Sequence, residues 1–121
     1  MAKSIMIIDD SPTLRHVVST ALRDMGYETV EAVDGADAID KLGGQSLSLI
    51  ICDVNMPNMD GLTFLREVKQ MKEYRFVPIL MLTTEAQPGK RQEAREAGAR
   101  AWIVKPFRID QLTSAVQKLI R

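Results

Sequence analysis

Short apolar runs alternate with longer amphipathic segments along the whole chain. A run of four to six mostly apolar residues is typical of a strand in a parallel sheet, because helices cover both faces of such a sheet. The strand candidates are residues 5–8, 29–33, 47–52, 78–82 and 101–104. The pattern therefore predicts five strands, of which residues 47–52 are strongly apolar.

Each strand candidate is followed by a segment that can form a helix. In the first, third and last of these segments apolar residues recur at three- and four-residue spacing, which indicates one buried face, whereas the fourth is weaker and is charged over most of its surface. In the first such segment Ser11 and Pro12 provide an N-cap and a first-turn proline, and Gly26 follows where the helix should end. The other helices are predicted around residues 36–42, 62–68, 88–97 and 109–119. Strands that alternate with helices indicate βαβ units, and hence an α/β fold with a doubly wound parallel sheet.

Length and composition favour one compact domain over residues 1–121, and a hydrophobic content of 45% supplies its core. Lys and Arg together number 16, as do Asp and Glu, so no net charge attracts nucleic acid or an anionic membrane. The single cysteine, Cys52, excludes an internal disulfide framework. No apolar stretch reaches the roughly 20 residues of a membrane span, and the N-terminal run is too short for a signal peptide. We therefore expect a cytoplasmic protein without nucleic-acid or membrane partners.

Polar residues with distinct chemistry follow four of the five predicted strands. They are Asp9 and Asp10, Asp53, Thr83 and Thr84, and Lys105 and Pro106, in strand order. In an open parallel sheet, ligands bind beyond the carboxyl ends of the strands, near the point where the strand order reverses. We therefore expect three carboxylates, a hydroxyl and an ammonium group to lie on one rim of the sheet.

Three carboxylates that lie close together repel one another, so they either take up protons or bind a cation. Oxygen ligands without a neighbouring His or Cys favour Mg²⁺ over zinc or copper. Such a cluster can hold a structural ion, bind a phosphorylated ligand, or accept a phosphoryl group on a carboxylate oxygen. Lys105 and Thr83 supply the charge and the donor that phosphoryl oxygens need. The residues by themselves leave these three uses open.

The residues on the predicted rim resemble those of one family over the whole chain, the receiver domain of two-component response regulators, particularly its CheY-like chemotaxis members. The matching pieces are Asp9-Asp10, the run Asp-Val-Asn-Met-Pro at 53–57, Asp60-Gly61, Thr83, and Lys-Pro-Phe at 105–107. The resemblance implies a flavodoxin/CheY-like (βα)5 fold with strand order 2-1-3-4-5. It also implies a phosphorylation-dependent signalling switch.

The family's site residues can be carried over to the matching positions. By resemblance, Asp53 accepts the phosphoryl group from a phosphohistidine on a sensor histidine kinase. Asp10, Asp53 and the backbone carbonyl of Asn55 bind Mg²⁺ directly, and Asp9 acts through a bound water. Asn55 and Glu85 flank the phosphoryl group and tune how quickly water removes it.

Further roles follow from the same resemblance. Lys105 pairs with the phosphoryl oxygens, and the peptide bond before Pro106 is expected to be cis. Thr83 donates its hydroxyl to the attached phosphoryl group, after which an aromatic side chain at the position of Trp102 swings inward. Family members usually carry tyrosine or phenylalanine there, whereas an indole is larger and has an N–H that needs a partner when buried. Simpler roles are a helix cap for Thr83 and a core or interface position for Trp102.

The expected output is binding of a protein target, because no separate output domain follows the last predicted helix. By resemblance the target binds the face formed by residues 88–97, residues 101–104 and the last helix, and a flagellar motor switch component is the first candidate.

A phosphate sink or a phosphorelay carrier would have nearly the same sequence. A Mg²⁺-dependent phosphatase with an Asp nucleophile is less favoured, because such enzymes commonly carry a second Asp where this chain has Asn55. A flavodoxin-type carrier is disfavoured because carboxylates line the rim where a flavin phosphate needs donors. The chain is thus expected to be a regulatory phosphoacceptor rather than an enzyme.

Overall fold

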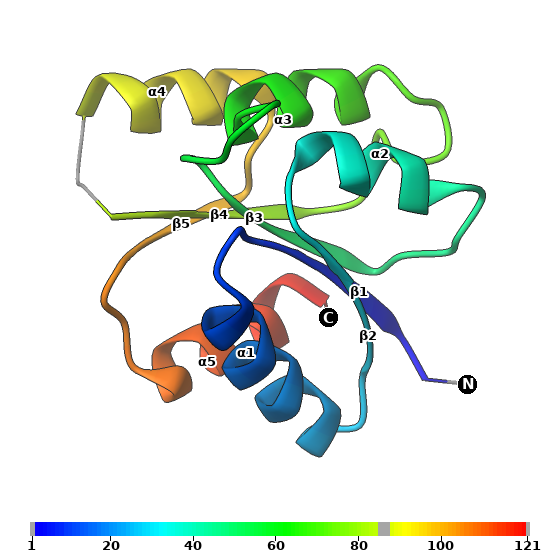
Figure 1. Ribbon diagram of the computed structural model, residues 1–121, viewed down its shortest axis with the longest axis vertical. Coiled ribbons are helices and arrows are strands. Elements are labelled where there is room, and N and C mark those ends of the chain that lie inside the picture. The colour runs from blue at the N-terminus through cyan, green and yellow to red at the C-terminus, as the bar shows by residue number, and fades with distance from the viewer. Residues whose placement is uncertain (1, 85–87, 121) are drawn as a thin grey trace.

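The computed structural model describes residues 2–84 and 88–120, which form five parallel strands and five helices (Figure 1). The strands are β1 (Ser4–Ile8), β2 (Glu28–Ala32), β3 (Leu49–Asp53), β4 (Ile79–Thr83) and β5 (Ala101–Val104). The helices are α1 (Pro12–Asp24), α2 (Gly35–Leu42), α3 (Gly61–Lys69), α4 (Pro88–Ala97) and α5 (Ile109–Ile120). The strand order is β2-β1-β3-β4-β5 and every pair is parallel, so the α/β class, the doubly wound sheet and the order 2-1-3-4-5 are confirmed.

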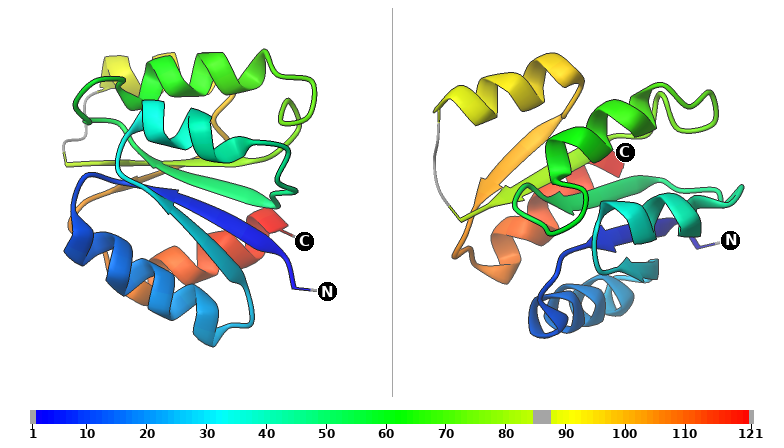
Figure 2. Two further views of the ribbon diagram at one scale, coloured as in Figure 1. Left: turned by 45° about the vertical axis from the view of Figure 1, so that its right-hand side comes forward. Right: turned by 45° about the horizontal axis from the view of Figure 1, so that its top comes forward.

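Helices cover both faces of the sheet. Figures 1 and 2 show α1 and α5 on one face and α2, α3 and α4 on the other. In β3, Leu49 and Ile51 pack into the core under α1 and α5, whereas Ile50 and Cys52 pack into the core on the opposite face. Because both sets are fully buried, the strand needs apolar residues at successive positions. This is why the central strands appear in the sequence as continuous apolar runs.

Four of the five strands differ by one or two residues from their predicted bounds, and β5 has the bounds that were predicted. β3 and β4 each extend one residue further than predicted and end on the polar residues Asp53 and Thr83. Asp53 pairs in register with Leu82, and Thr83 pairs with Val104. Backbone pairing in a sheet does not depend on side-chain polarity, so an apolar pattern underestimates how far a strand runs into a polar rim. The two site residues are therefore held by the sheet itself.

The predicted helix signals are present at the first helix. The Ser11 side chain accepts a hydrogen bond from the backbone N–H of Leu14 at 3.2 Å, and Pro12 is the first helical residue. Gly26 has a φ of 96° directly after the C-cap, a conformation that favours glycine.

None of the helices that the structure describes is long and apolar enough to cross a membrane.

Candidate functional site

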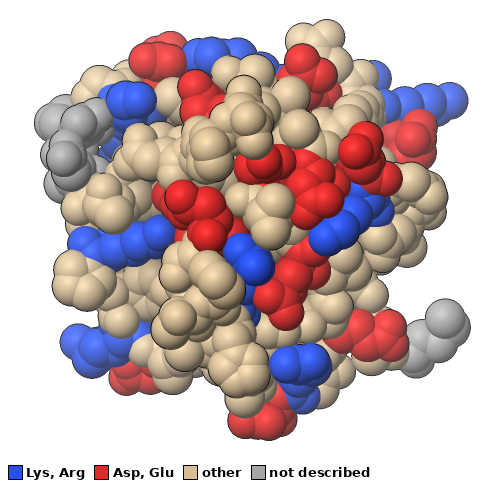
Figure 3. All heavy atoms as spheres, in the orientation of Figure 1, with Lys and Arg blue, Asp and Glu red and all other residues tan. Residues whose placement is uncertain are grey.

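Three carboxylates meet at the carboxyl ends of β1 and β3. Asp9, Asp10 and Asp53 each offer an oxygen, and these oxygens all lie within 4.8 Å of one another. Asp9 and Asp53 are buried, whereas Asp10 is exposed. Figure 3 shows acidic side chains gathered in the middle of the face over these strand ends. The predicted acidic cluster is therefore present, with one of its three carboxylates accessible to solvent.

The ammonium group of Lys105 bridges two of these carboxylates. Its Nζ lies 2.8 Å from Asp9 Oδ2 and 3.3 Å from Asp53 Oδ2. The lysine directly follows β5, and its backbone N–H donates to the Thr83 carbonyl at 2.6 Å. The Lys105–Pro106 peptide bond is cis. The residues after three separate strands thus converge on one pocket.

The turn between β1 and α1 is held by groups that sequence reasoning missed. The backbone N–H of Ser11 donates to Asp9 Oδ1 at 2.8 Å. Arg15 donates from Nη1 to the backbone carbonyl of Asp9 at 2.5 Å, and its Nε lies 3.2 Å from Glu31 Oε1 on β2. Arg15 lies on the first turn of α1, six residues after Asp9. This closeness in sequence was the only signal that could have predicted the contact between them. Asp9 is therefore restrained at its backbone and at both carboxylate oxygens.

The loop between β3 and α3 lies directly against Asp53. The backbone N–H of Asn55 donates to Asp53 Oδ1 at 3.2 Å, and that of Gly61 donates to the Val54 carbonyl at 2.9 Å. A Cβ atom at Gly61 would lie only 2.2 Å from the Asp53 carbonyl oxygen. Glycine is therefore needed where α3 begins, because any side chain would collide with the backbone of the predicted phosphoacceptor.

The electrostatics of the pocket favour an additional cation. Burial raises the pKa of the Asp53 carboxyl and the charge of Asp9 raises it further, while Lys105 and the Asn55 N–H act in the opposite direction. Burial alone would lower the pKa of Lys105, but hydrogen bonds and charges from Asp9 and Asp53 outweigh it and raise that pKa. The cluster thus holds three carboxylates and one ammonium group, which contacts two of them, so carboxylates outnumber the ammonium group. A hard divalent cation with oxygen ligands suits such a pocket.

The remaining predicted residues with a described position lie on β4, on β5 and in the loop after β3. Thr83 is buried at the end of β4, on the same rim, and Asn55 is exposed in the loop after β3. Trp102 belongs to β5 and pairs with Met81, and it packs into the core on the side of α2, α3 and α4. Its indole nitrogen is buried and has no hydrogen-bond partner in the described part of the chain. Glu85 lies outside the described residues.

The doubly wound five-stranded sheet thus carries carboxylates and a lysine at the ends of β1, β3 and β5, the arrangement that the resemblance to receiver domains implies. The chain matches the family model "Response regulator receiver domain" over residues 5–117, and it belongs to this family. It is therefore a phosphorylation-dependent signalling switch, as predicted.

Similar proteins include bacterial chemotaxis proteins and receiver domains of histidine kinases. The chain is 36% identical to the chemotaxis protein CheY of Pseudomonas aeruginosa over 95% of this chain and 94% of that one. It is 37% identical to CheY-3 of Vibrio cholerae, over 95% of this chain and 89% of that one. The structure of Vibrio cholerae CheY4 superposes with a TM-score of 0.94 at 42% identity, covering 98% and 99% of the two chains. The receiver domain of sensor histidine kinase PA1611 from Pseudomonas aeruginosa, with a magnesium ion coordinated in its active site cleft, superposes with a TM-score of 0.89 at 30% identity, covering 99% and 98%.

Proposed function

We propose that a sensor histidine kinase transfers a phosphoryl group to Asp53 of this chain. A carboxylate oxygen of Asp53 attacks phosphorus, and a P–O bond forms while the P–N bond to the donor's phosphohistidine breaks. The released imidazole nitrogen takes up a proton from water. Such transfer requires in-line positioning and positive charge on the equatorial oxygens of the phosphoryl group. The observation that carries the proposal is the buried carboxylate of Asp53 with the Lys105 ammonium 3.3 Å away.

Mg²⁺ is the cation that the donor set favours. Oxygen ligands and the excess of carboxylates over ammonium in the pocket fit this ion better than zinc or copper. We assign Asp10, Asp53 and the backbone carbonyl of Asn55 as its protein ligands, and Asp9 as a ligand acting through water. When bound, the ion supplies positive charge that offsets the repulsion between the carboxylates and the incoming phosphoryl group.

Four residues act on the phosphoryl group in this proposal. Lys105 moves its ammonium from the carboxylates to the phosphoryl oxygens, and Thr83 donates its hydroxyl to them. We assign to Asn55 and Glu85, by the family resemblance alone, the role of tuning how quickly water removes the group. Because these side chains are polar, we expect the phosphorylated state to be short-lived.

The output is a change in affinity for a protein target in the cytoplasm. We assign the whole of residues 1–121 to one receiver domain with a regulatory rather than an enzymatic role. We propose a flagellar motor switch component as its target. The target binds the face formed by α4, β5 and α5.

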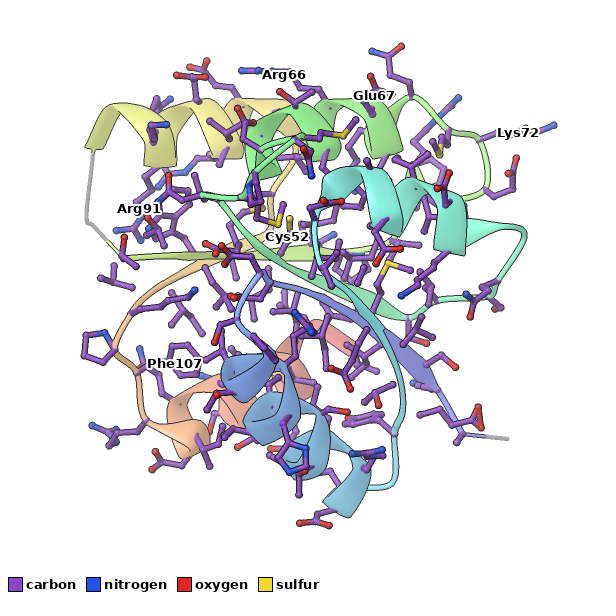
Figure 4. All side chains as sticks on the ribbon, in the orientation of Figure 1. Cys52, Arg66, Glu67, Lys72, Arg91 and Phe107 are labelled. Carbon is purple, nitrogen blue, oxygen red and sulfur yellow. The ribbon has the colours of Figure 1, made fainter. Side chains whose placement is uncertain are left out.

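A cavity of about 280 Å³ on this face is lined by Trp102 and by three arginines, Arg91, Arg95 and Arg100. Arg91 belongs to α4, and Phe107 lies in the segment between β5 and α5 (Figure 4). A relay carrier is the alternative, because receiver domains of histidine kinases are among the similar structures.

The function is tested by incubating the protein with a small phosphodonor and measuring its intact mass. With Mg²⁺ present we expect the mass to increase by one phosphoryl group. With excess chelator we expect the adduct to fall to a trace, because the carboxylates then repel the donor. Absence of any adduct under conditions that trap short-lived acyl phosphates would contradict the proposal, and equal labelling with chelator would contradict the metal assignment.

Trp102 provides a second readout, because it is the only tryptophan of the chain. Its buried N–H lacks a hydrogen-bond partner within the described residues, an arrangement that costs about 1–3 kcal/mol. We therefore expect phosphorylation to move the ring to a position where the N–H is satisfied, with a change in its fluorescence emission. The measurement is an emission spectrum before and after the phosphodonor is added. The same addition to Asp53→Asn is the control, and an unchanged spectrum at full labelling would show that Trp102 does not switch.

A further inference from the structure

One side-chain hydrogen bond fastens the loop between β3 and α3 to the start of α2. The amide Nδ2 of Asn58, in this loop, donates to Asp34 Oδ2 at 2.7 Å. Next to this bond the two segments touch, because a Cβ atom at Gly35 would lie 2.9 Å from Cγ of Met59. Both segments come from different parts of the sheet, Asp34 following β2 and Asn58 following β3. The bond therefore sets how the loop after Asp53 lies against its neighbour.

Asp34 is a rigid anchor for this bond. Asp34 is 7% exposed and is the N-cap of α2. Its other oxygen, Oδ1, accepts a hydrogen bond from the backbone N–H of Asp37 at 2.8 Å. These hydrogen bonds, first that from Asp37 and then that from Asn58, lower the pKa of the Asp34 carboxyl, so it is charged at neutral pH. A hydrogen bond to a charged acceptor is shorter and roughly twice as strong as one between neutral groups. The anchor is thus fixed at one oxygen by a helix and holds the loop with the other.

The backbone of Asn58 is shaped for the same contact. Its φ is 67°, and the other described residues with positive φ are all glycines. Asparagine tolerates this left-handed conformation better than most residues. Glycine would also satisfy the backbone, but it has no amide. The combination of this backbone angle with a donor aimed at Asp34 requires asparagine among the common residues of such turns.

The loop that Asn58 anchors also carries the backbone carbonyl of Asn55, which is a ligand in the proposed function. The loop is tied to the pocket at its start, where the Asn55 N–H donates to Asp53 Oδ1 at 3.2 Å, and at its end, where the Gly61 N–H donates to the Val54 carbonyl. Between those two points, the side chain of Asn58 forms a hydrogen bond to Asp34, in the loop between β2 and α2. We propose that Asn58 is a positioning residue, which through Asp34 holds the Asn55 carbonyl where it can bind the divalent cation. This inference rests on the proposed function.

The test measures Mg²⁺ binding to the unphosphorylated protein by isothermal titration calorimetry. Asn58→Gly keeps the backbone angle and removes the amide, so we expect it to fold with a similar melting temperature. We expect its Mg²⁺ affinity to fall about tenfold, since residues that orient metal ligands typically contribute 10- to 100-fold to affinity. The matched control is Gln45→Gly, which removes an exposed amide that donates to the Lys41 carbonyl at the other end of α2. We expect wild-type affinity for the control.

A charge-conserving exchange separates positioning from general stability. Asn58→Asp places two carboxylates against each other, so we expect a loss of Mg²⁺ affinity at least as large as that of Asn58→Gly. Adding Asp34→Asn restores a donor and an acceptor, and the new Asn side chain still offers an oxygen to cap α2. We expect this double variant to recover Mg²⁺ affinity to within about threefold of the wild-type value. A threefold difference corresponds to about half of the 1.4 kcal/mol that a tenfold difference represents.

The outcomes distinguish the inference from the function on which it rests. Wild-type Mg²⁺ affinity in Asn58→Gly would overturn the positioning role, as would failure of the folded double variant to regain affinity. If the wild-type protein bound no Mg²⁺, the metal assignment of the proposed function would itself be wrong. Reduced affinity in Asn58→Gly, with recovery in the double variant and no effect of Gln45→Gly, is the expected result.

Discussion

Replacing Asp53 by asparagine is expected to abolish phosphorylation of the protein while leaving it folded. The amide of asparagine is uncharged and a poor nucleophile, so no acyl phosphate can form at this position. Lys105 retains Asp9 at 2.8 Å as its partner, so the pocket is not left with an unpaired ammonium group. The expected result is that intact mass shows no adduct after incubation with a phosphodonor and Mg²⁺, under conditions in which the wild-type protein is labelled.

The same substitution is also expected to raise thermal stability at neutral pH. Burial and the neighbouring charge of Asp9 raise the pKa of Asp53, so its ionised form is less favourable in the folded than in the unfolded protein. The unfavourable contribution is fully present above the raised pKa. It is lost as pH falls through that pKa toward the ordinary value of 3.8. We therefore expect Asp53→Asn to melt at a higher temperature than wild type near pH 7, with a difference that narrows in acid.

Asp40 offers a matched control for both measurements, because it is an exposed carboxylate on α2. Asp40→Asn removes one negative charge without touching the pocket, so we expect normal labelling and little change in melting temperature. Persistent labelling of Asp53→Asn would place the phosphoacceptor on another residue. A lower melting temperature at neutral pH would show instead that the Asp53–Lys105 pair stabilises the fold.

Replacing Gly61 by alanine is expected to damage both the fold and the site. The new Cβ atom would lie 2.2 Å from the carbonyl oxygen of Asp53 and 2.8 Å from Cα of Val54. Both are backbone atoms at the end of a buried central strand, so neither can move without disturbing the sheet. We expect a loss of about 3 kcal/mol or more of stability, at the upper end for overpacked sites. This corresponds to a fall of roughly 10 °C in melting temperature.

Phosphorylation of Gly61→Ala should fall as well, because relief of the collision displaces the backbone that carries the Asp53 carboxylate. Labelling is measured well below the melting temperature, so that unfolding does not account for the loss. Gly89→Ala is the control, since a Cβ atom at that helical position meets nothing within 4 Å. We expect Gly89→Ala to match wild type or to be slightly more stable. Equal stability of Gly61→Ala and Gly89→Ala would show that α3 can shift away from β3 at little cost.

Much of the fold could be predicted from local pattern. Residues 88–97 and 101–104 were predicted with the bounds that the structure has, because a proline at the start and Gly98 after the end of the helix, and a short apolar run for the strand, are local signals. The ends of β3 and β4 could not be placed, since Asp53 and Thr83 are held by pairing with neighbouring strands. The order of the strands came from family resemblance, because alternation of strands and helices is compatible with several orders.

The roles of individual site residues depended far more on tertiary structure. Asp9 and Asp10 are adjacent and chemically identical, yet Asp9 is buried against Lys105 while Asp10 is exposed. Only the fold sets this difference, since Asp9 and Lys105 are 96 residues apart. The bond from Asn58 to Asp34 had no sequence signal for the same reason, because its partners follow different strands.

The sequence by itself determined that Asp9, Asp10, Asp53, Thr83 and Lys105 end or follow strands of a parallel sheet, and hence lie on one rim. Apolar periodicity is a property of neighbouring residues, so it places each residue along its own element. Distances between elements, burial and pKa arise from packing among distant segments. The tertiary structure alone therefore decided that Lys105 bridges Asp9 and Asp53, that Asp10 remains open to solvent, and that Trp102 is packed with its N–H unsatisfied among the described residues.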